Sequence, residues 1–188
     1  MGRKPNPDRK FEVLEAVTAH ITARGLHQTA LRGLAEHLGT STYTFVYHFG
    51  SKDGMIAAVL ERVNVEREAD LQRLSLELSG GLEQRLRALW EWSLRDEALA
   101  ATALMLDALS LARVEPSLYL PAAQRYRHST EQFIASQLAA TGAATHCASA
   151  TTSVLMGLHT DYLTDHDRAA AVARFERLLT AFPVTAPA

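Results

Sequence analysis

The sixteen residues LGTSTYTFVYHFGSKD, from Leu38 to Asp53, bring together side chains that suit contact with a polyanion. A glycine break precedes a run of small hydroxyl residues, four aromatic residues follow, and a lysine-bearing turn ends the stretch. Hydroxyl and cationic groups donate hydrogen bonds to phosphate oxygens and base edges, and a threonine methyl packs on a thymine methyl. A buried strand would alternate apolar with polar residues, so the aromatic spacing here favours a helix.

The elements that must position this stretch are helical. We predict a first helix over residues 8–24, a short second helix with Thr29 as its N-cap, and a third over about 42–48 capped by Ser41 or Thr42. Gly39 separates the second helix from the third. Two short helices joined in this way match a helix-turn-helix, whose second helix enters the major groove of DNA.

Within the third helix, Phe45 and Phe49 are four residues apart and are expected to face inward, while Tyr43 and Tyr47 project from another face. Arg32, in the second helix, is either a DNA contact or a solvated charge. The residues predicted to bind DNA are Thr29, Arg32, Ser41, Thr42, Tyr43, Thr44, Tyr47, His48 and Lys52.

Charge is divided unevenly along the chain. Residues 1–52 hold seven Lys or Arg and four Asp or Glu, a net charge of +3, whereas residues 53–188 carry −5. A basic head on an acidic body suits a local electrostatic task such as neutralising phosphates. The basic residues Arg3, Lys4, Arg9 and Lys10 are either an arm that touches DNA or a solubilising tail.

The whole chain is predicted to be all-α, because prolines are absent between Pro7 and Pro116 and β-branched alternation is missing. A fourth helix starts at Lys52, and a glycine pair at 80–81 precedes the next. Further helices are expected over about 98–113, 118–140, 143–163 and 168–182. We expect a DNA-binding domain over residues 1–52 and a larger helical domain over 53–188.

The segment AEHLGTSTYTFVYHFGSKD, from Ala35 to Asp53, resembles the signature of the TetR family of bacterial transcriptional regulators. Three positions depart from the family pattern: Thr40 replaces the usual Val, Val46 replaces an aromatic that commonly touches the DNA backbone, and Ala30 lacks a frequent hydroxyl. The matching positions are Gly39, Ser41, Thr44, Tyr47, His48, Phe49, Ser51 and Lys52.

This resemblance implies a cytoplasmic homodimer that binds a near-palindromic double-stranded DNA operator, more often as a repressor than as an activator or a ligand-independent regulator. It also implies a C-terminal half that binds a small-molecule effector and dimerises through its last two helices. The sequence is compatible with a four-helix interface formed by Leu155, Leu158, Tyr162, Phe175, Leu178 and Leu179.

Aromatic and sulfur side chains in the C-terminal half are candidates for the effector pocket, although residues of these types at helical spacing also form ordinary cores. A mostly apolar pocket would favour a hydrophobic or amphipathic ligand. The candidates are Trp90, Trp92, Met105, Tyr119, Tyr126 and Phe133.

Other classes of function lack support in the sequence. No HExxH, GxSxG or phosphate-binding glycine loop is present, so we expect neither catalysis nor a cofactor. His146, His159, His166, Cys147 and Asp161 match no compact metal-ligand spacing. The uncharged run from Gln132 to Thr160 is broken at Gly142 and rich in Ser and Thr, which argues against a membrane span. A helical partner-binding module without DNA affinity is the remaining alternative.

Overall fold

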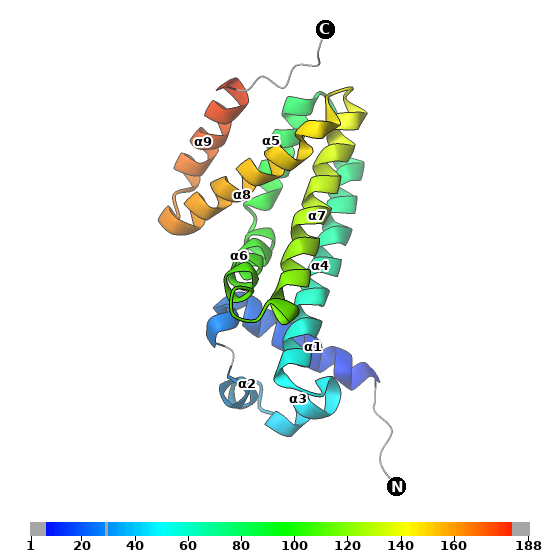
Figure 1. Ribbon diagram of the computed structural model, residues 1–188, viewed down its shortest axis with the longest axis vertical. Coiled ribbons are helices and arrows are strands. Elements are labelled where there is room, and N and C mark those ends of the chain that lie inside the picture. Colours follow the sequence, from blue (N-terminus) through cyan, green and yellow to red (C-terminus); the bar gives the residue numbers. More distant parts are fainter. Residues whose placement is uncertain (1–6, 29, 182–188) are drawn as a thin grey trace. The chain divides into compact units, whose positions relative to one another are not determined.

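The computed structural model describes residues 7–28 and 30–181, which fold into α-helices joined by short turns (Figure 1). The helices are α1 (Pro7–Arg24), α2 (Leu31–His37), α3 (Thr42–Phe49), α4 (Lys52–Glu77), α5 (Leu82–Ser93), α6 (Asp96–Leu111), α7 (Pro116–Ala140), α8 (Ala148–Asp165) and α9 (Arg168–Ala181). Two short 3-10 helices, η1 (Leu26–Gln28) and η2 (Thr145–Cys147), complete the described elements. The prediction of an all-α fold is confirmed.

The chain divides into two compact units. The first contains Met1–Glu66 and Ala103–Gln124, and the second contains Arg67–Thr102 and Arg125–Ala188. Helices α4, α6 and α7 therefore each contribute residues to both units. The division into domains at residues 52 and 53 stays a prediction, because these units group the chain by packing.

The first unit packs α1, α2 and α3 around the N-terminal part of α4 (blue to cyan in Figure 1). Val17 and Ile21 of α1 are fully buried, and so are Phe45 of α3 and Met55 of α4. The spacing of four residues in α1 puts Val17 and Ile21 on one face of the helix. Burial of their apolar surface stabilises the fold by about 25 cal/mol for each Å² removed from water. The core of the first unit thus fixes α3 through a single large ring.

The junction after α1 depends on a close approach to α6 within the first unit. Gly25 has φ +81°, and a Cβ built on it would lie 2.7 Å from Oδ2 of Asp107. The same carboxylate oxygen accepts a hydrogen bond of 3.1 Å from the buried Leu26 N–H. The left-handed backbone at position 25 therefore favours glycine, and a Cβ there would also displace the Asp107 carboxylate from Leu26.

The second unit has a core in which Trp90 of α5 stacks on Phe175 of α9, with ring centroids 5.3 Å apart and planes 12° apart. Helices α8 and α9 lie side by side (orange to red in Figure 1) and meet at His166, whose φ of 53° ends α8. Arg87 of α5 holds Glu176 of α9 by two hydrogen bonds of 2.8 Å each. These contacts fasten α9 to α5 within the unit.

Several predicted helix boundaries were wrong by a few residues. Pro116 begins α7 rather than preceding it, because a proline in the first turn forfeits an N–H that has no helical partner there. Pro121 is accommodated inside the same helix. Residues before Ala148 form η2 instead of the first turn of α8, and α6 begins two residues earlier than expected.

No helix in the described ranges is both long enough and apolar enough to span a bilayer.

Removing the Asp107 carboxylate is expected to destabilise the first unit. In Asp107→Ala the buried Leu26 N–H loses its acceptor, and the free energy of unfolding should fall by about 1–3 kcal/mol. The measurement is urea unfolding followed by circular dichroism. Asp161→Ala removes an exposed carboxylate of α8 and should change stability by about 0.5 kcal/mol at most. Equal stability of the two variants would contradict the role assigned to Asp107.

Candidate functional site

The turn between α2 and α3 is built from backbone geometry and hydroxyl groups. Gly39 adopts φ +59°, a left-handed conformation that other residues rarely tolerate. Ser41 is the N-cap of α3, and its Oγ accepts a hydrogen bond of 3.3 Å from the Thr44 N–H. The Thr44 hydroxyl lies 3.0 Å from that of Thr40 and 3.1 Å from that of Ser41. The sequence prediction of a cap at Ser41 or Thr42 is confirmed at Ser41.

The start of α2 differs from the prediction. Ala30 is the N-cap of α2 and makes no side-chain capping hydrogen bond, whereas Thr29 had been expected in that role. Thr29 lies outside the described residues. An alanine has no oxygen with which to cap the first turn, so the orientation of α2 depends on its buried residues Leu34 and Ala35.

The aromatic residues of α3 divide between core and surface. Phe45 is fully buried and Phe49 is half-buried, whereas Tyr43 and Tyr47 are 71% and 46% exposed. The two tyrosine rings lie 6.1 Å apart and form a continuous aromatic surface. The predicted inward and outward faces of α3 are therefore confirmed for these four residues.

Several other predicted DNA-contact residues are also at least partly exposed. Thr42 and Lys52 are exposed at the start of α3 and of α4, and His48 is half-buried with its ring 5.1 Å from that of Tyr47. Arg32 is exposed and pairs with Glu36 at 3.1 Å on α2. Ser41 and Thr44 take part in the capping contacts described above, so any DNA contact by their hydroxyls would be additional.

Two of the four N-terminal basic residues, Arg9 and Lys10, lie in the first turn of α1. Arg9 pairs with Glu12 at 2.9 Å, and Lys10 Nζ lies 5.8 Å from the centroid of the Phe49 ring. Arg3 and Lys4 fall outside the described residues. The choice between a DNA-contacting arm and a solubilising tail therefore stays open.

The second unit contains a small enclosed cavity of about 20 Å³. Two predicted effector residues, Trp92 and Tyr126, line it together. The other lining residues are Arg67, Leu89, Ser93, Thr102, Thr130, Leu155, Met156 and His159. Sequence reasoning missed Arg67 because it stands among other charged residues in VEREADLQR, where nothing in the pattern marks one charge as buried.

Hydrogen bonds fix the polar side chains of this cavity. The Thr102 hydroxyl donates to the Ala98 carbonyl at 2.9 Å, so the Tyr126 hydroxyl, 2.6 Å away, donates to Thr102. Arg67 donates to the hydroxyls of Ser129 at 3.2 Å and Thr130 at 2.8 Å. The cavity is thus a rigid polar network with aromatic walls.

His159 belongs to the same cavity and is neutral near pH 7. The Ser93 hydroxyl donates to the Trp90 carbonyl at 2.7 Å, so it accepts from His159 Nε2, 2.8 Å away. His159 Nδ1 is buried and has no hydrogen-bond partner among the described residues. Burial lowers the pKa of His159 to about 4, a nearby Leu155 carbonyl opposes the shift, and the charge of Arg67 adds to it.

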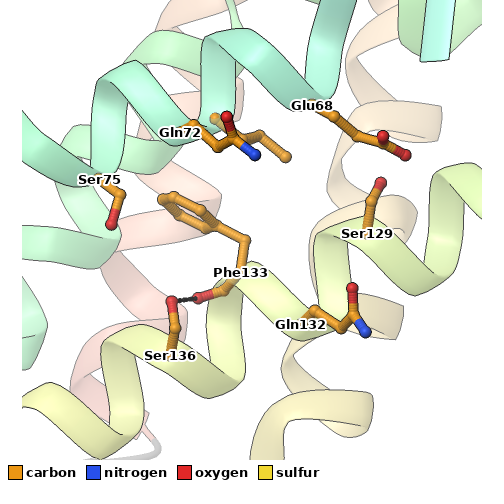
Figure 2. Close-up of a pocket in the computed structure, with 8 residues that line it drawn as sticks. Glu68, Gln72, Ser75, Ser129, Gln132, Phe133 and Ser136 are labelled. Atoms are coloured by element: carbon orange, nitrogen blue, oxygen red, sulfur yellow. Dashed lines mark hydrogen bonds between the residues drawn. The ribbon is translucent and has the colours of Figure 1, made fainter. Parts of the chain in front are cut away.

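The remaining effector candidates lie elsewhere. Trp90 is in the core of the second unit against Phe175, and Met105 and Tyr119 are buried in the first unit. Phe133 lines an open groove of about 350 Å³ between α4 and α7 (Figure 2). Of the six candidates, Trp92 and Tyr126 line the cavity described above.

The groove around Phe133 is mainly polar. Figure 2 shows its walls, where the Ser136 hydroxyl donates to the Phe133 carbonyl at 2.6 Å. Glu68 is the acidic group of the groove, and Arg125 holds its carboxylate by two hydrogen bonds of 2.8 Å. The hydrogen bond from Arg125 lowers the pKa of Glu68. This carboxylate therefore stays ionised, and its negative charge is paired with Arg125 inside the protein.

The six predicted dimer residues fall into two groups. Leu155 and Phe175 are buried in the core of their own chain, at 5% and 2% exposure. The half-buried residues Leu158, Tyr162, Leu178 and Leu179 keep surface available on α8 and α9. An interface formed by these helices would use the second group directly and the first only as support.

No cluster of three or more His, Cys, Asp or Glu residues in the described part of the chain is arranged to hold a metal ion.

Comparisons with known proteins point to the same kind of helix-turn-helix. Residues 13–59 match the model of the bacterial regulatory proteins of the tetR family. The HTH-type transcriptional regulator BetI of Escherichia coli is 29% identical over 98 residues, which are 52% of this chain and 50% of BetI. The chain spans about half the length of the curated relatives it matches.

Two solved structures share the fold along nearly the whole chain. A TetR transcriptional regulator from Legionella pneumophila has a TM-score of 0.75 at 16% identity, covering 96% of this chain and 98% of that one. A transcriptional regulator from Saccharomonospora viridis in complex with choline has a TM-score of 0.70 at 24% identity, covering 94% and 96% of the two chains.

Acid is expected to destabilise the second unit through His159. The pKa is 6.5 for an ordinary histidine and about 4 in the folded chain, so between these values the unfolded state binds a proton that the folded state does not. The contribution of the neutral His159 to the free energy of unfolding is fully present above pH ~6.5. It is lost as the pH falls toward ~4, and the loss is at most about 3 kcal/mol.

Urea unfolding of the wild type and His159→Gln at pH 7.5 and pH 5 measures this contribution. The variant should lose less stability between the two pH values, while His128→Gln, which removes an exposed imidazole, should behave as the wild type does. Identical pH dependence in wild type and His159→Gln would contradict a buried neutral His159.

Proposed function

Because the chain belongs to the TetR family of bacterial transcriptional regulators, we propose that it represses transcription by binding an operator as a homodimer and that a small-molecule effector releases it. As a member of this family the chain is a DNA-binding regulator rather than an enzyme. Its place of action is the cytoplasm, where the DNA of a bacterium lies.

One observation carries the DNA-binding part of the proposal. The α3 helix is anchored by the buried Phe45 and presents Thr42, Tyr43 and Tyr47 to solvent, directly before the exposed Lys52. A helix fixed on one side and lined on the other with hydroxyl and aromatic groups suits insertion into the major groove. We propose that the exposed Lys52 holds a phosphate of the DNA backbone.

Operator release requires an effector that binds the DNA-incompetent arrangement more tightly. Such an effector weakens DNA binding by the same coupling free energy with which DNA weakens effector binding, typically ~1–3 kcal/mol. The cavity lined by Trp92, Tyr126 and Arg67 supports an effector site in the second unit. The choline complex of the Saccharomonospora viridis regulator supports ligand binding by this fold.

Loss of the Lys52 charge is expected to weaken DNA binding without changing its sequence preference. Fluorescence anisotropy of the full chain on its own upstream DNA, across a salt series, should give for Lys52→Ala a salt slope smaller by about one ion than that of the wild type. Arg73→Ala removes an exposed cation of α4 in the second unit and is the control. An unchanged slope for Lys52→Ala would remove this residue from the interface, and absence of wild-type binding at low salt would overturn the regulator proposal.

A charge placed on α9 is expected to break the dimer. Leu178 is half-buried and lies outside the core cluster of the second unit, so Leu178→Arg should leave the fold intact while burying an unpaired cation in the proposed interface. Light scattering after size exclusion should show a dimer for the wild type and a monomer for the variant. Leu76→Arg changes a leucine of α4 that is 89% exposed and should stay dimeric. If the Leu178→Arg variant stayed dimeric, the proposal that α9 forms the dimer interface would be contradicted.

A further inference from the structure

Arg67 is a buried cation that donates no hydrogen bond to an acidic group in the described part of the chain. Its side chain belongs to α4 and the residue is only 6% exposed. Within residues 7–28 and 30–181, the groups that accept hydrogen bonds from its guanidinium are the neutral hydroxyls of Ser129 and Thr130. The charge of Arg67 helps to lower the pKa of the neighbouring Glu68, but the Glu68 carboxylate is hydrogen-bonded by Arg125, so one carboxylate serves two arginines. A positive charge therefore remains inside the second unit.

Such a charge is costly unless something nearby compensates it, because burial removes its hydration. The Tyr126 ring does part of this, with its centroid 3.9 Å from the guanidinium carbon, and the Trp92 ring lies at 6.0 Å. Aromatic faces attract cations but do not cancel their charge. The hydroxyls of Ser129 and Thr130 both donate to the Tyr126 carbonyl, so they accept from Arg67 as neutral groups.

The guanidinium also has donors to spare at the cavity. Its two hydrogen bonds use two of the five N–H groups of an arginine, and Arg67 lines the cavity. A guanidinium in this state matches a carboxylate, which accepts two parallel N–H bonds.

We propose that the effector is a small organic monocarboxylate whose carboxylate pairs with Arg67 and whose apolar body packs against Trp92, Leu155 and Met156. This inference rests on the proposed function, since it names the chemical class of the effector. One guanidinium neutralises one negative charge, so a phosphate dianion would leave charge uncompensated in the same cavity. The apolar walls require a hydrocarbon group beside the carboxylate.

The same geometry disfavours cationic ligands. A quaternary ammonium is normally held on the faces of aromatic rings, but the face of Tyr126 is taken by Arg67. A second positive charge placed beside it would be repelled at short range in a site poor in water. The cavity of this chain therefore selects the opposite charge.

Entry of a ligand requires one wall to move. A volume of about 20 Å³ holds roughly one water molecule, which is less than a carboxylate with its hydrocarbon body needs. Met156 is the only half-buried residue among those lining the cavity, all of which lie in the described part of the chain. A methionine side chain changes rotamer readily, so Met156 is the wall that opens.

Thermal unfolding and isothermal titration of the full-length chain test the proposal with matched probes. The acids are phenylacetate and hexanoate, the neutral counterparts are phenylacetamide and hexanamide, and the cation is hexyltrimethylammonium. At least one acid should raise the melting temperature and bind measurably, and its amide and the ammonium should not. Absence of binding by both acids, or equal binding of acid and amide, would overturn the proposal.

Variants connect the binding to Arg67. Arg67→Gln should lower the affinity for the acid about tenfold or more, because a charge-assisted pair is lost. Arg73→Gln on the same helix should bind the acid as the wild type does. Arg67→Lys keeps the charge but loses the two-pronged geometry and should be intermediate. If Arg67→Gln does not fold, the comparison of acid with amide on the wild type decides alone. An Arg67 that only ties α4 to α7 would leave acid binding unchanged in both variants.

DNA binding measured on the same samples separates this inference from the proposed function. Operator binding without binding of either acid would overturn the effector class and leave the regulator standing. Acid binding that depends on Arg67, without any DNA binding at low salt, would support the site and overturn the regulator.

Discussion

Burial of Phe45 is the constraint on which the proposed DNA-binding surface depends. A helix as short as α3 has too few internal hydrogen bonds to be stable alone, so its orientation comes from the side chain that it inserts into the core. Once Phe45 is buried, the helical period leaves Tyr43 and Tyr47 exposed on another face. The Ser41 cap and the left-handed Gly39 then set where α3 begins. The exposure of the residues proposed to recognise DNA is therefore a consequence of how the opposite face of α3 packs.

The second unit follows the opposite logic, because its most telling feature is a polar group that packing alone does not explain. Arg67 could have been replaced by an apolar residue in a core of this kind at little cost in stability. Its hydroxyl partners and the rings of Tyr126 and Trp92 hold it in one position instead. A fixed positive charge that is only partly compensated beside a cavity lowers the free energy of a bound anion and raises that of a bound cation. Regulation by an anion would therefore use an interaction that the unliganded fold leaves incomplete.

Helix α6 is of interest for communication because it supplies residues to both units. Thr102 accepts the Tyr126 hydroxyl at the cavity, and five positions later Asp107 accepts the Leu26 N–H at the end of α1. Each contact is a single hydrogen bond with a fixed direction. A displacement of this helix would weaken one of these hydrogen bonds, and a buried donor left without an acceptor costs about 1–3 kcal/mol.

Sequence alone determined the helical class, the helix-turn-helix and the faces of α3, because these depend on local periodicity, capping and glycine positions. The sequence also indicated Trp92 and Tyr126 as candidates for the effector pocket, and both line the cavity. It grouped them with Met105 and Tyr119, which tertiary packing puts in a different unit. Aromatic residues look alike along a chain whether they line a cavity or fill a core. Only the tertiary structure showed that Arg67 is buried without donating a hydrogen bond to an acidic group of the described residues, and that His159 faces the same cavity. Burial and charge pairing are set by residues dozens of positions apart, so no local pattern could reveal them.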